Sequence, residues 1–265
     1  MTDDKATKEK KLAGRVAIVT GASLGIGRAT AIALGREGAD VVVNYRSHDG
    51  AADEVVEAIQ QFGSRAVKHQ ADVADQQAVE QLVARAQQEF GRVDIAISNA
   101  AFSEREPFLE ADMDRFRRTV DVTMWGAFYL LRATARQMIE NRDVGAIVLV
   151  SSPQAFVAIA TSMAYNISKA ALEHMSKTAA LELAEHRIRV NTIQPGWIDT
   201  PGERKFASDE KLLAEAKKIP VGRLGQPEEI AEAILFLCDP AHEYMTGATL
   251  LFDGGITLPW WKNTD

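Results

Sequence analysis

A tyrosine and a lysine in the middle of the chain have the types and spacing needed for acid–base chemistry. Tyr165 and Lys169 are separated by four positions, so on a helix they lie on one face, one turn apart. An ammonium group beside a phenol favours the phenolate, and the pairing therefore predicts a lowered pKa for Tyr165. Such a tyrosine can exchange a proton with an alcohol or a carbonyl near neutral pH.

A serine completes this candidate site. Ser152 comes directly after the apolar run Ala146–Ser151, which we expect to be a strand. Open parallel sheets bind ligands at the carboxyl ends of their strands, so the Ser152 hydroxyl is placed to donate a hydrogen bond to a substrate oxygen. A Tyr-x-x-x-Lys pair on its own usually belongs to an ordinary helix surface, so the surrounding segments decide its meaning.

A glycine-rich loop, TGASLGIG at positions 20–27, lies between an expected strand and an expected helix. Gly21, Gly25 and Gly27 allow a tight turn, and the helix that follows offers its free N–H groups to a pyrophosphate. A plain glycine-rich turn is the alternative. The strand before the loop and the helix after it are the context that a dinucleotide site requires.

The end of the second expected strand, NYRS at Asn44–Ser47, indicates which dinucleotide would bind. An acid there would hold a ribose 2′-hydroxyl, whereas an arginine accommodates a 2′-phosphate. Because Arg46 is present and no acid is, the segment favours NADP, unless Arg46 is only a solvated surface charge. NAD stays possible, since Leu24 and not a basic residue occupies the glycine loop.

Strand-like and helix-like segments alternate along the whole chain, which predicts a parallel sheet covered on both faces. We expect a single-domain α/β fold, a doubly wound (Rossmann-type) seven-stranded parallel sheet, over residues 12–265 after a flexible tail at 1–11. The expected strands are at 15–20, 40–45, 65–70, 93–98, 146–151, 188–193 and 249–253, and the expected helices at 27–38, 51–63, 78–91, 113–139, 165–185 and 227–238.

Composition limits the other function classes. The net charge of −7 disfavours nucleic acid as a partner, and no apolar stretch is long enough for a membrane span or a secretory signal. The single cysteine, Cys238, allows no intramolecular disulfide and fits a cytoplasmic location. We expect no metal site, since no cluster of histidines and acids has ligand spacing.

Taken together, these segments resemble the short-chain dehydrogenase/reductase family. The resemblance runs from about Leu12 to the C-terminal tail. It rests on TGASLGIG, ADV at 71–73, SNAA at 98–101, Ser152, Tyr165, Lys169, QPGWIDTP at 194–201 and TGATLLFDGG at 246–255.

The resemblance implies a role for each matching residue. Tyr165 would be the acid/base, Lys169 would also hold the nicotinamide ribose, and Ser152 would polarise the substrate oxygen. Gln154 would face the substrate, a small molecule. The implied cofactor contacts are Gly21, Ser23, Leu24, Gly25, Ile26 and Gly27 in the loop, Arg46, Asp72 and Val73, then Asn99, Ala100 and Ala101 by the adenosine ribose, Tyr165 and Lys169, and Pro195, Gly196, Ile198 and Thr200 around the nicotinamide.

Two positions depart from the family pattern. Thr123 stands where the family has a fourth catalytic residue, an asparagine whose main-chain carbonyl holds a water linked to the lysine, and Ala101 replaces a glycine. A threonine keeps that carbonyl. These departures motivate an alternative of another class, a dinucleotide-sensing protein without catalysis, although the intact Ser152, Tyr165 and Lys169 argue against it.

The substrate is less closely defined. The NYRS segment and the ending TGATLLFDGGITLP are similar to those of glucose 1-dehydrogenases, which favours a sugar or polyol, and also to those of 3-oxoacyl-carrier-protein reductases. We expect 154–164 and the loop after Thr200 to line the substrate pocket. There Arg204 and Lys205 attract an anionic substrate or are merely solvated. A homotetramer is implied, and Trp260 and Trp261 are expected to pack on a partner subunit, over the pocket or locally.

Overall fold

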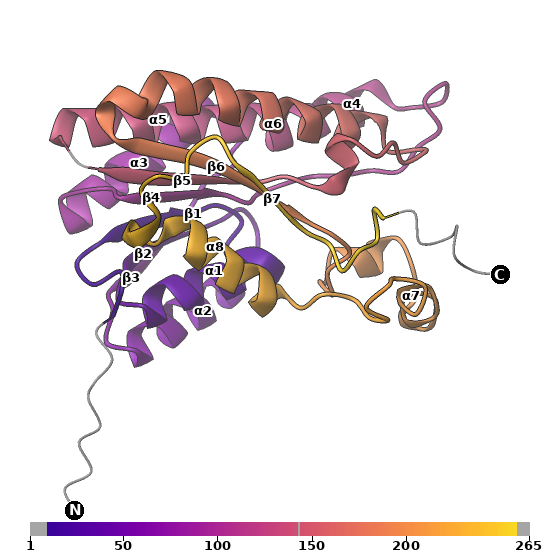
Figure 1. The fold of residues 1–265 in the computed structure, drawn as a ribbon, viewed down its shortest axis with the longest axis horizontal. Helices are drawn as coiled ribbons and strands as arrows, with labels where there is room; N and C mark the ends of the chain where they lie inside the picture. Colours follow the sequence, from indigo (N-terminus) through magenta and orange to yellow (C-terminus); the bar gives the residue numbers. More distant parts are fainter. Residues whose placement is uncertain (1–9, 143, 259–265) are drawn as a thin grey trace, which may run out of the picture.

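The computed structural model describes residues 10–142 and 144–258. Seven parallel strands form one sheet in the order β3-β2-β1-β4-β5-β6-β7, with helices on both faces (Figure 1). This confirms the predicted doubly wound α/β fold. The strands are β1 Val16–Val19, β2 Asp40–Tyr45, β3 Ala66–Gln70, β4 Ile95–Ser98, β5 Gly145–Val150, β6 Ile188–Pro195 and β7 Thr249–Phe252.

The central strands are buried along their whole length because both of their faces are covered. Every residue of β1, β4, β5 and β6 is buried. β7 lies at the sheet edge and is more open, with Leu251 and Phe252 exposed. Strands of a parallel sheet are buried in this way when helices cover both of its faces.

Two layers of helices enclose the sheet. Helices α1, α2 and α8 cover one face, and α3, α5 and α6 cover the other, each over its own hydrophobic cluster (Figure 1). Helix α7 lies apart from both layers. The helices are α1 Gly25–Arg36, α2 Asp49–Gln61, α3 Gln76–Phe90, α4 Met113–Val120, α5 Gly126–Asn141, α6 Met163–Leu183, α7 Asp209–Ala216 and α8 Pro227–Cys238.

The long helix predicted at 113–139 contains an irregular turn. Between α4 and α5 the chain forms a π-helical turn at Asp121–Trp125, in which the N–H of Gly126 bonds to the carbonyl of Asp121. Such wide turns inside α-helices are frequent at functional sites. Thr123 lies in this turn and is almost fully buried.

The strand order places the candidate residues at one edge of the sheet. β1 pairs with β2 on one side and with β4 on the other, so the chain reverses its direction of winding at β1. Ligands of open α/β sheets bind at the carboxyl ends of the strands at such a reversal. The glycine loop, Asn99 and Ser152 follow β1, β4 and β5 at this edge.

The chain ends are only partly described. The side chain of Lys10 donates to the carbonyl of Phe62 over 2.5 Å, and that of Lys11 pairs with Asp239 over 2.7 Å. The predicted division into a tail at 1–11 and a domain at 12–265 stays a prediction. Trp260 and Trp261 lie outside the described residues.

Candidate active site

The structure brings the predicted chemical groups together. Tyr165 and Lys169 share one face near the start of α6, with Lys169 Nζ 5.2 Å from the centre of the Tyr165 ring. Ser152 follows β5 and is hydrogen-bonded to the Tyr165 side chain. Lys169 is buried, and its Nζ donates to the carbonyl of Val150 over 2.6 Å.

The acidities of these groups differ from the sequence prediction. Burial raises the pKa of Tyr165, the charge of Glu203 raises it further, and only the hydrogen bond with Ser152 lowers it. Burial also lowers the pKa of Lys169 to about 7. The predicted lowering of the Tyr165 pKa by Lys169 is therefore not found, because burial disfavours the charged form of both side chains.

The buried lysine should make the fold more stable towards high pH. Its pKa falls from 10.5 to about 7 on folding, so the unfolded chain binds more protons between these values. The penalty for burying a charged Lys169 therefore grows as pH falls from about 10 to 7 and is constant below. We expect Lys169→Met to stabilise the protein by on the order of 2 kcal/mol at pH 6 in urea titrations. The gain should shrink towards pH 10; a gain independent of pH contradicts this account.

Gln154, the predicted substrate residue, begins the segment between β5 and α6. Its backbone N–H donates to Ser152 Oγ over 3.2 Å. Its side-chain Oε1 is buried and accepts no hydrogen bond from the described residues. Buried polar atoms are normally paired, so this oxygen is suited to a donor on a bound molecule.

A cavity of about 370 Å³ opens over the glycine loop. Most of the predicted cofactor residues line it. They are Gly21, Ser23, Leu24, Gly25, Ile26, Arg46, Asp72, Val73, Asn99, Ala100, Ala101 and Thr200.

The glycines of the loop are required by close contacts. A Cβ on Gly27 would lie 2.3 Å from the carbonyl oxygen of Gly21 and 2.5 Å from Asn99 Nδ2. Gly25 has a φ of 55°, and a Cβ there would approach Thr200 at 3.2 Å. Asn99 holds the loop in place, because its Nδ2 donates to the carbonyl of Thr20 over 2.9 Å.

The loop also leaves the start of α1 open. Leu24 is the N-cap residue, and no side chain caps the helix. The first N–H groups of a helix without such a cap can bind an anion, and the helix dipole favours its negative charge. The cavity thus has a phosphate-binding wall where the sequence predicts one.

The far end of the cavity contains an arginine that the sequence analysis missed. Arg118, on α4, pairs with Asp72 over 2.6 Å and lines the cavity with Arg46. Burial opposes ionisation of Asp72, but Arg118 and the N–H of Ala74 hold its pKa below the usual range. The pair joins positions 46 residues apart, which no local pattern could indicate. Two guanidinium groups, those of Arg46 and Arg118, therefore line this cavity.

Other predicted cofactor residues lie at the end of β6 and do not line this cavity. Pro195 ends the strand, and the N–H of Gly196 donates to Phe252 over 2.9 Å. A Cβ on Gly196 would lie 2.6 Å from Asp253 Cα, so this glycine is required by sheet packing. Ile198 is buried and forms an isolated bridge with Gly225.

Thr123 has a structural task that a hydroxyl suits well. Its Oγ1 accepts from the N–H of Phe102 and donates to the carbonyl of the same residue, both over 3.1 Å. One side chain thus ties the π-helical turn to the segment after β4, which carries Ala100 and Ala101 at the cavity. These two hydrogen bonds fix the segment and involve the Thr123 side chain, whereas the predicted proton relay uses its main-chain carbonyl.

We expect Thr123→Val to loosen this connection. Valine has the same shape but leaves the N–H and carbonyl of Phe102 without their partner, at a cost of about 1–3 kcal/mol. Urea unfolding should show the loss, and affinity for the dinucleotide should fall. Thr123→Ser, which keeps the hydroxyl, should preserve both; equal effects of Ser and Val would contradict the role of the hydroxyl.

Arg204 and Lys205 are not free to attract an anionic substrate. Arg204 pairs with Asp199 over 2.9 Å and with Asp209 over 2.8 Å. Lys205 pairs with Glu104 over 2.5 Å. Both side chains are nevertheless about half exposed, so these cations are paired within the chain and also in contact with solvent.

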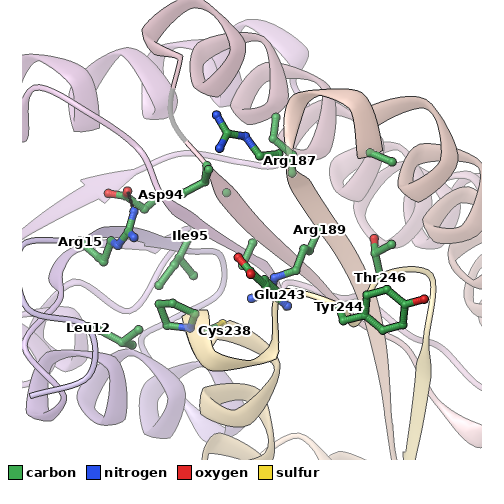
Figure 2. A pocket seen from close by; sticks show the side chains of 16 residues that line it. Leu12, Arg15, Asp94, Ile95, Arg187, Arg189, Cys238, Glu243, Tyr244 and Thr246 are labelled. Atoms are coloured by element: carbon green, nitrogen blue, oxygen red, sulfur yellow. Dashed lines mark hydrogen bonds and ion pairs between the residues drawn. The ribbon is translucent and has the colours of Figure 1, made fainter.

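A larger cavity, of about 650 Å³, lies at the opposite edge of the sheet, where the strands begin (Figure 2). Arg15 and Asp94 form one of its sides and Tyr244 another (Figure 2). None of the predicted site residues lines it. Cavity size alone therefore does not identify the active site. The predicted catalytic side chains lie at the other edge of the sheet, at the carboxyl ends of the strands.

The described residues, 10–142 and 144–258, contain neither a membrane-spanning helix nor a metal-binding cluster. No helix in this part of the chain is long and apolar enough to cross a membrane. Within the same residues, no group of three or more histidine, cysteine or acidic side chains could hold a metal ion.

Comparison with known proteins decides the family. A family model described as enoyl-(acyl carrier protein) reductase matches residues 21–257. A solved short-chain type dehydrogenase/reductase from Mycobacterium marinum superposes with a TM-score of 0.88 at 35% identity, covering 94% of this chain and 97% of that one. The chain belongs to the short-chain dehydrogenase/reductase family.

Several relatives in this family are named dehydrogenases. L-rhamnose 1-dehydrogenase (NAD(P)(+)) of Sphingomonas sp. (strain SKA58) is 40% identical, with 93% of this chain and 98% of the relative covered. Glucose 1-dehydrogenase 2 of Bacillus subtilis is 38% identical, with 94% and 97% covered. A solved 7α-hydroxysteroid dehydrogenase, complexed with NADH and 7-oxo glycochenodeoxycholic acid, has a TM-score of 0.87 at 36% identity, with 93% and 96% covered.

These relatives span nearly the full length of the chain, so the short-chain dehydrogenase/reductase assignment applies to the molecule as a whole. The protein is an oxidoreductase that acts on CH–OH groups with a nicotinamide dinucleotide. The alternative of a sensing protein without catalysis is therefore not needed.

Proposed function

We propose that the protein interconverts a secondary alcohol and a carbonyl compound, with Tyr165 as acid/base, Ser152 polarising the substrate oxygen and Lys169 assisting the tyrosine. The observation that carries this proposal is the meeting of the three side chains at the carboxyl edge of the sheet, the edge at which the glycine loop also lies. We further propose NADP as the preferred cofactor, with NAD also accepted.

The residues of the cavity fit a dinucleotide. The uncapped start of α1 suits the pyrophosphate, and the space that a Cβ on Gly27 would fill is already occupied by backbone. Arg46 is exposed at the end of β2, and its side chain makes no hydrogen bond or ion pair with the described residues. This arginine, with Arg118 nearby, supports the preference for a 2′-phosphate.

The proton chemistry follows from the site. When bound, the nicotinamide supplies or accepts the hydride. The raised pKa of Tyr165 keeps its hydroxyl protonated at neutral pH, which suits the donation of a proton to the carbonyl oxygen during reduction. Ser152 donates a hydrogen bond to that oxygen as negative charge develops on it. A protonated Lys169 stabilises the tyrosinate left behind.

We propose a sugar or polyol as the substrate class. The named relatives that act on rhamnose and glucose support it, as does the polar Gln154 with its buried oxygen that lacks a partner in the described residues. A less polar carbonyl compound is the second candidate. The exposed Phe156, Val157 and Ile159 favour it, and relatives include 3beta-hydroxysteroid dehydrogenase 1 of Eggerthella lenta, 38% identical with 93% of this chain covered. The acyl-carrier-protein thioester alternative belongs with this second class.

The experiment is a substrate panel measured with each dinucleotide. Oxidation of sugars, polyols and hydroxysteroids, and reduction of diketones and 3-oxoacyl thioesters, would be followed by nicotinamide absorbance. Arg46→Ser should weaken NADPH binding by about tenfold and leave NADH binding nearly unchanged, because only one ligand carries the 2′-phosphate. Turnover of thioesters or steroids alone would overturn the sugar proposal. Equal loss for both dinucleotides would overturn the role of Arg46.

We also propose that the protein is a cytoplasmic homotetramer. Exposed apolar side chains on the helices and at the edge strand β7 support an assembly, among them Trp125, Ile167, Leu251 and Phe252. The buried single thiol of Cys238 is consistent with a reducing compartment. Sedimentation equilibrium would test the assembly.

A further inference from the structure

A carboxylate lies one helical turn beyond the lysine of the candidate active site. Glu173 follows Lys169 by four positions on α6, so the two side chains share one face of the helix. The same spacing separates Tyr165 from Lys169, and the three side chains therefore form one row along α6. Lys169 is buried, whereas Glu173 is only partly buried. The row runs from the tyrosine through a buried amine to an acid.

Two hydrogen bonds hold the carboxylate of Glu173 in place. One oxygen accepts from Gln194 Nε2 over 2.9 Å, and the other accepts from Thr249 Oγ1 over 2.7 Å. Gln194 is buried near the end of β6, and Thr249 begins β7. Both donors are neutral, so they fix the position of the carboxylate without cancelling its charge.

Lys169 needs an opposite charge nearby because it is buried. The hydrogen-bond acceptor of its Nζ, the carbonyl of Val150 at 2.6 Å, is neutral. Burial disfavours the ammonium form and lowers the pKa of Lys169 to about 7, and the charge of Glu173 opposes this effect. Near neutral pH, the protonated fraction of such a lysine is sensitive to a single neighbouring charge.

The elements that surround Lys169 contribute few other charges. β5, β7 and the turn Pro153–Ala155 have no charged side chain. The charged residue of β6, Arg189, lies at the opposite end of that strand, and α5 has none before Arg132. The next charged groups of α6 itself, His174 and Lys177, are exposed.

The charges of α4 and of the π-helical turn are mostly paired elsewhere. Arg115 pairs with Glu106, Arg117 with Asp114 and Arg118 with Asp72, and Asp121 lies in the turn. Beyond β6, the charge of Glu203 acts on Tyr165. Among the described residues, Glu173 is the charged side chain that acts on the acidity of Lys169.

We propose that Glu173 is a positioning residue of the active site: its carboxylate, held by Gln194 and Thr249, keeps Lys169 protonated for its role beside Tyr165. The effect on turnover rests on the proposed function, whereas the effect on the protonation of Lys169 does not. Two measurements therefore test them separately.

The pH profile of carbonyl reduction tests the effect on turnover. Reduction should slow as Lys169 loses its proton, so kcat should fall above a midpoint near pH 7 in the original protein. We expect Glu173→Gln, which keeps the shape and removes the charge, to move this midpoint down by about one pH unit. At pH 8 kcat should then be about tenfold lower than in the original protein, and at pH 5.5 nearly equal, with KM changed less than about twofold.

Urea unfolding at two pH values tests the protonation of Lys169 without any substrate. At pH 6 the folded original protein buries a protonated Lys169 beside a carboxylate, whereas Glu173→Gln buries it without one. At pH 8 the folded lysine is largely neutral in both proteins, so this difference disappears. The unfolding constant of Glu173→Gln, relative to the original protein, should be about fivefold larger at pH 6 than at pH 8. With Lys169→Met in both chains, the ratio should be the same at both pH values.

Two control variants separate charge from hydrogen bonding. Glu182→Gln makes the same substitution at an exposed position of α6 and should leave the midpoint and the unfolding ratio unchanged. Thr249→Val removes one hydrogen bond to Glu173 and keeps its charge, so it should move the midpoint by less than about 0.3 pH unit. A shift in Thr249→Val as large as that in Glu173→Gln would overturn the role of the charge.

Each remaining result also decides the proposal. An unfolding ratio of Glu173→Gln that does not depend on pH overturns it, and so does a ratio that keeps its pH dependence with Lys169→Met. If Glu173→Gln does not fold by circular dichroism, Lys169→Met in the same chain should restore folding, because it removes the buried amine that Glu173 compensates. A double variant that also fails to fold overturns the proposal. Failure of the catalytic assignment shows instead as turnover that survives in Tyr165→Phe.

Discussion

Replacing Tyr165 with phenylalanine should lower kcat/KM by about a thousandfold, because positioned proton transfer contributes 10²–10⁴ to a rate. The change removes one hydroxyl and keeps the ring against which Lys169 lies 5.2 Å from the centre. Binding of the dinucleotide should change less than about twofold, since Tyr165 does not line the cavity over the glycine loop. Steady-state kinetics and fluorescence titration with NADPH measure the two effects.

Ser152→Ala serves as the companion variant. It removes the hydrogen bond to Tyr165 and the donor to the substrate oxygen, and should cost about a hundredfold. The double variant should be little worse than Tyr165→Phe, because residues that act as one unit are not additive. Retention of more than a tenth of the activity by Tyr165→Phe would place the acid elsewhere.

Replacing Asp94 with alanine should destabilise the protein by about 3 kcal/mol, although the residue lies at the edge of the sheet away from the site. Its carboxylate is 2% exposed. It accepts from Arg15 over 2.7 Å, from Arg92 over 2.6 and 2.8 Å, and from the N–H of Val16 over 2.9 Å (Figure 2 shows Arg15 beside it). Removing it leaves these donors without their shared acceptor at the start of β1.

Urea unfolding followed by tryptophan fluorescence would measure this loss. Asp114→Ala is the matched control, because Asp114 pairs with Arg117 on the helix surface and its side chain is 92% exposed. Such a pair contributes about 0–1 kcal/mol. Activity per folded molecule should be unaffected in both variants. If the two variants lost similar amounts of unfolding free energy, the buried carboxylate of Asp94 would contribute no more to stability than an exposed one.

The fold could be predicted from the sequence because its signals are local. The apolar runs of β1 and β5 indicate strands that are buried on both faces. The glycine loop lies between a strand and a helix, as a dinucleotide-binding loop requires. Helix α8 was predicted with its observed limits, since Pro227 and the residues after Cys238 mark both ends.

The parts that could not be predicted depend on contacts between distant positions. The spacing of apolar residues does not reveal the single wide turn at Asp121–Trp125. The residues around Arg118 do not indicate that it pairs with Asp72. The acidity of Tyr165 was predicted in the wrong direction because the four-residue spacing shows the lysine but not the burial. The ion pair between Glu104 and Lys205 was missed for the same reason, since about 100 residues separate the two side chains along the chain.

The residues that line the cavity over the glycine loop come from several segments of the chain, the first at Gly21 and the last at Gly202. During synthesis the amino-terminal strands leave the ribosome first, but the wall formed by Thr200 and Gly202 arrives only after β6 has been made. A nascent chain can therefore form β1 to β5 before it can hold a dinucleotide firmly. A chain that ends before β6 therefore lacks the part of the cavity wall that Thr200 and Gly202 form.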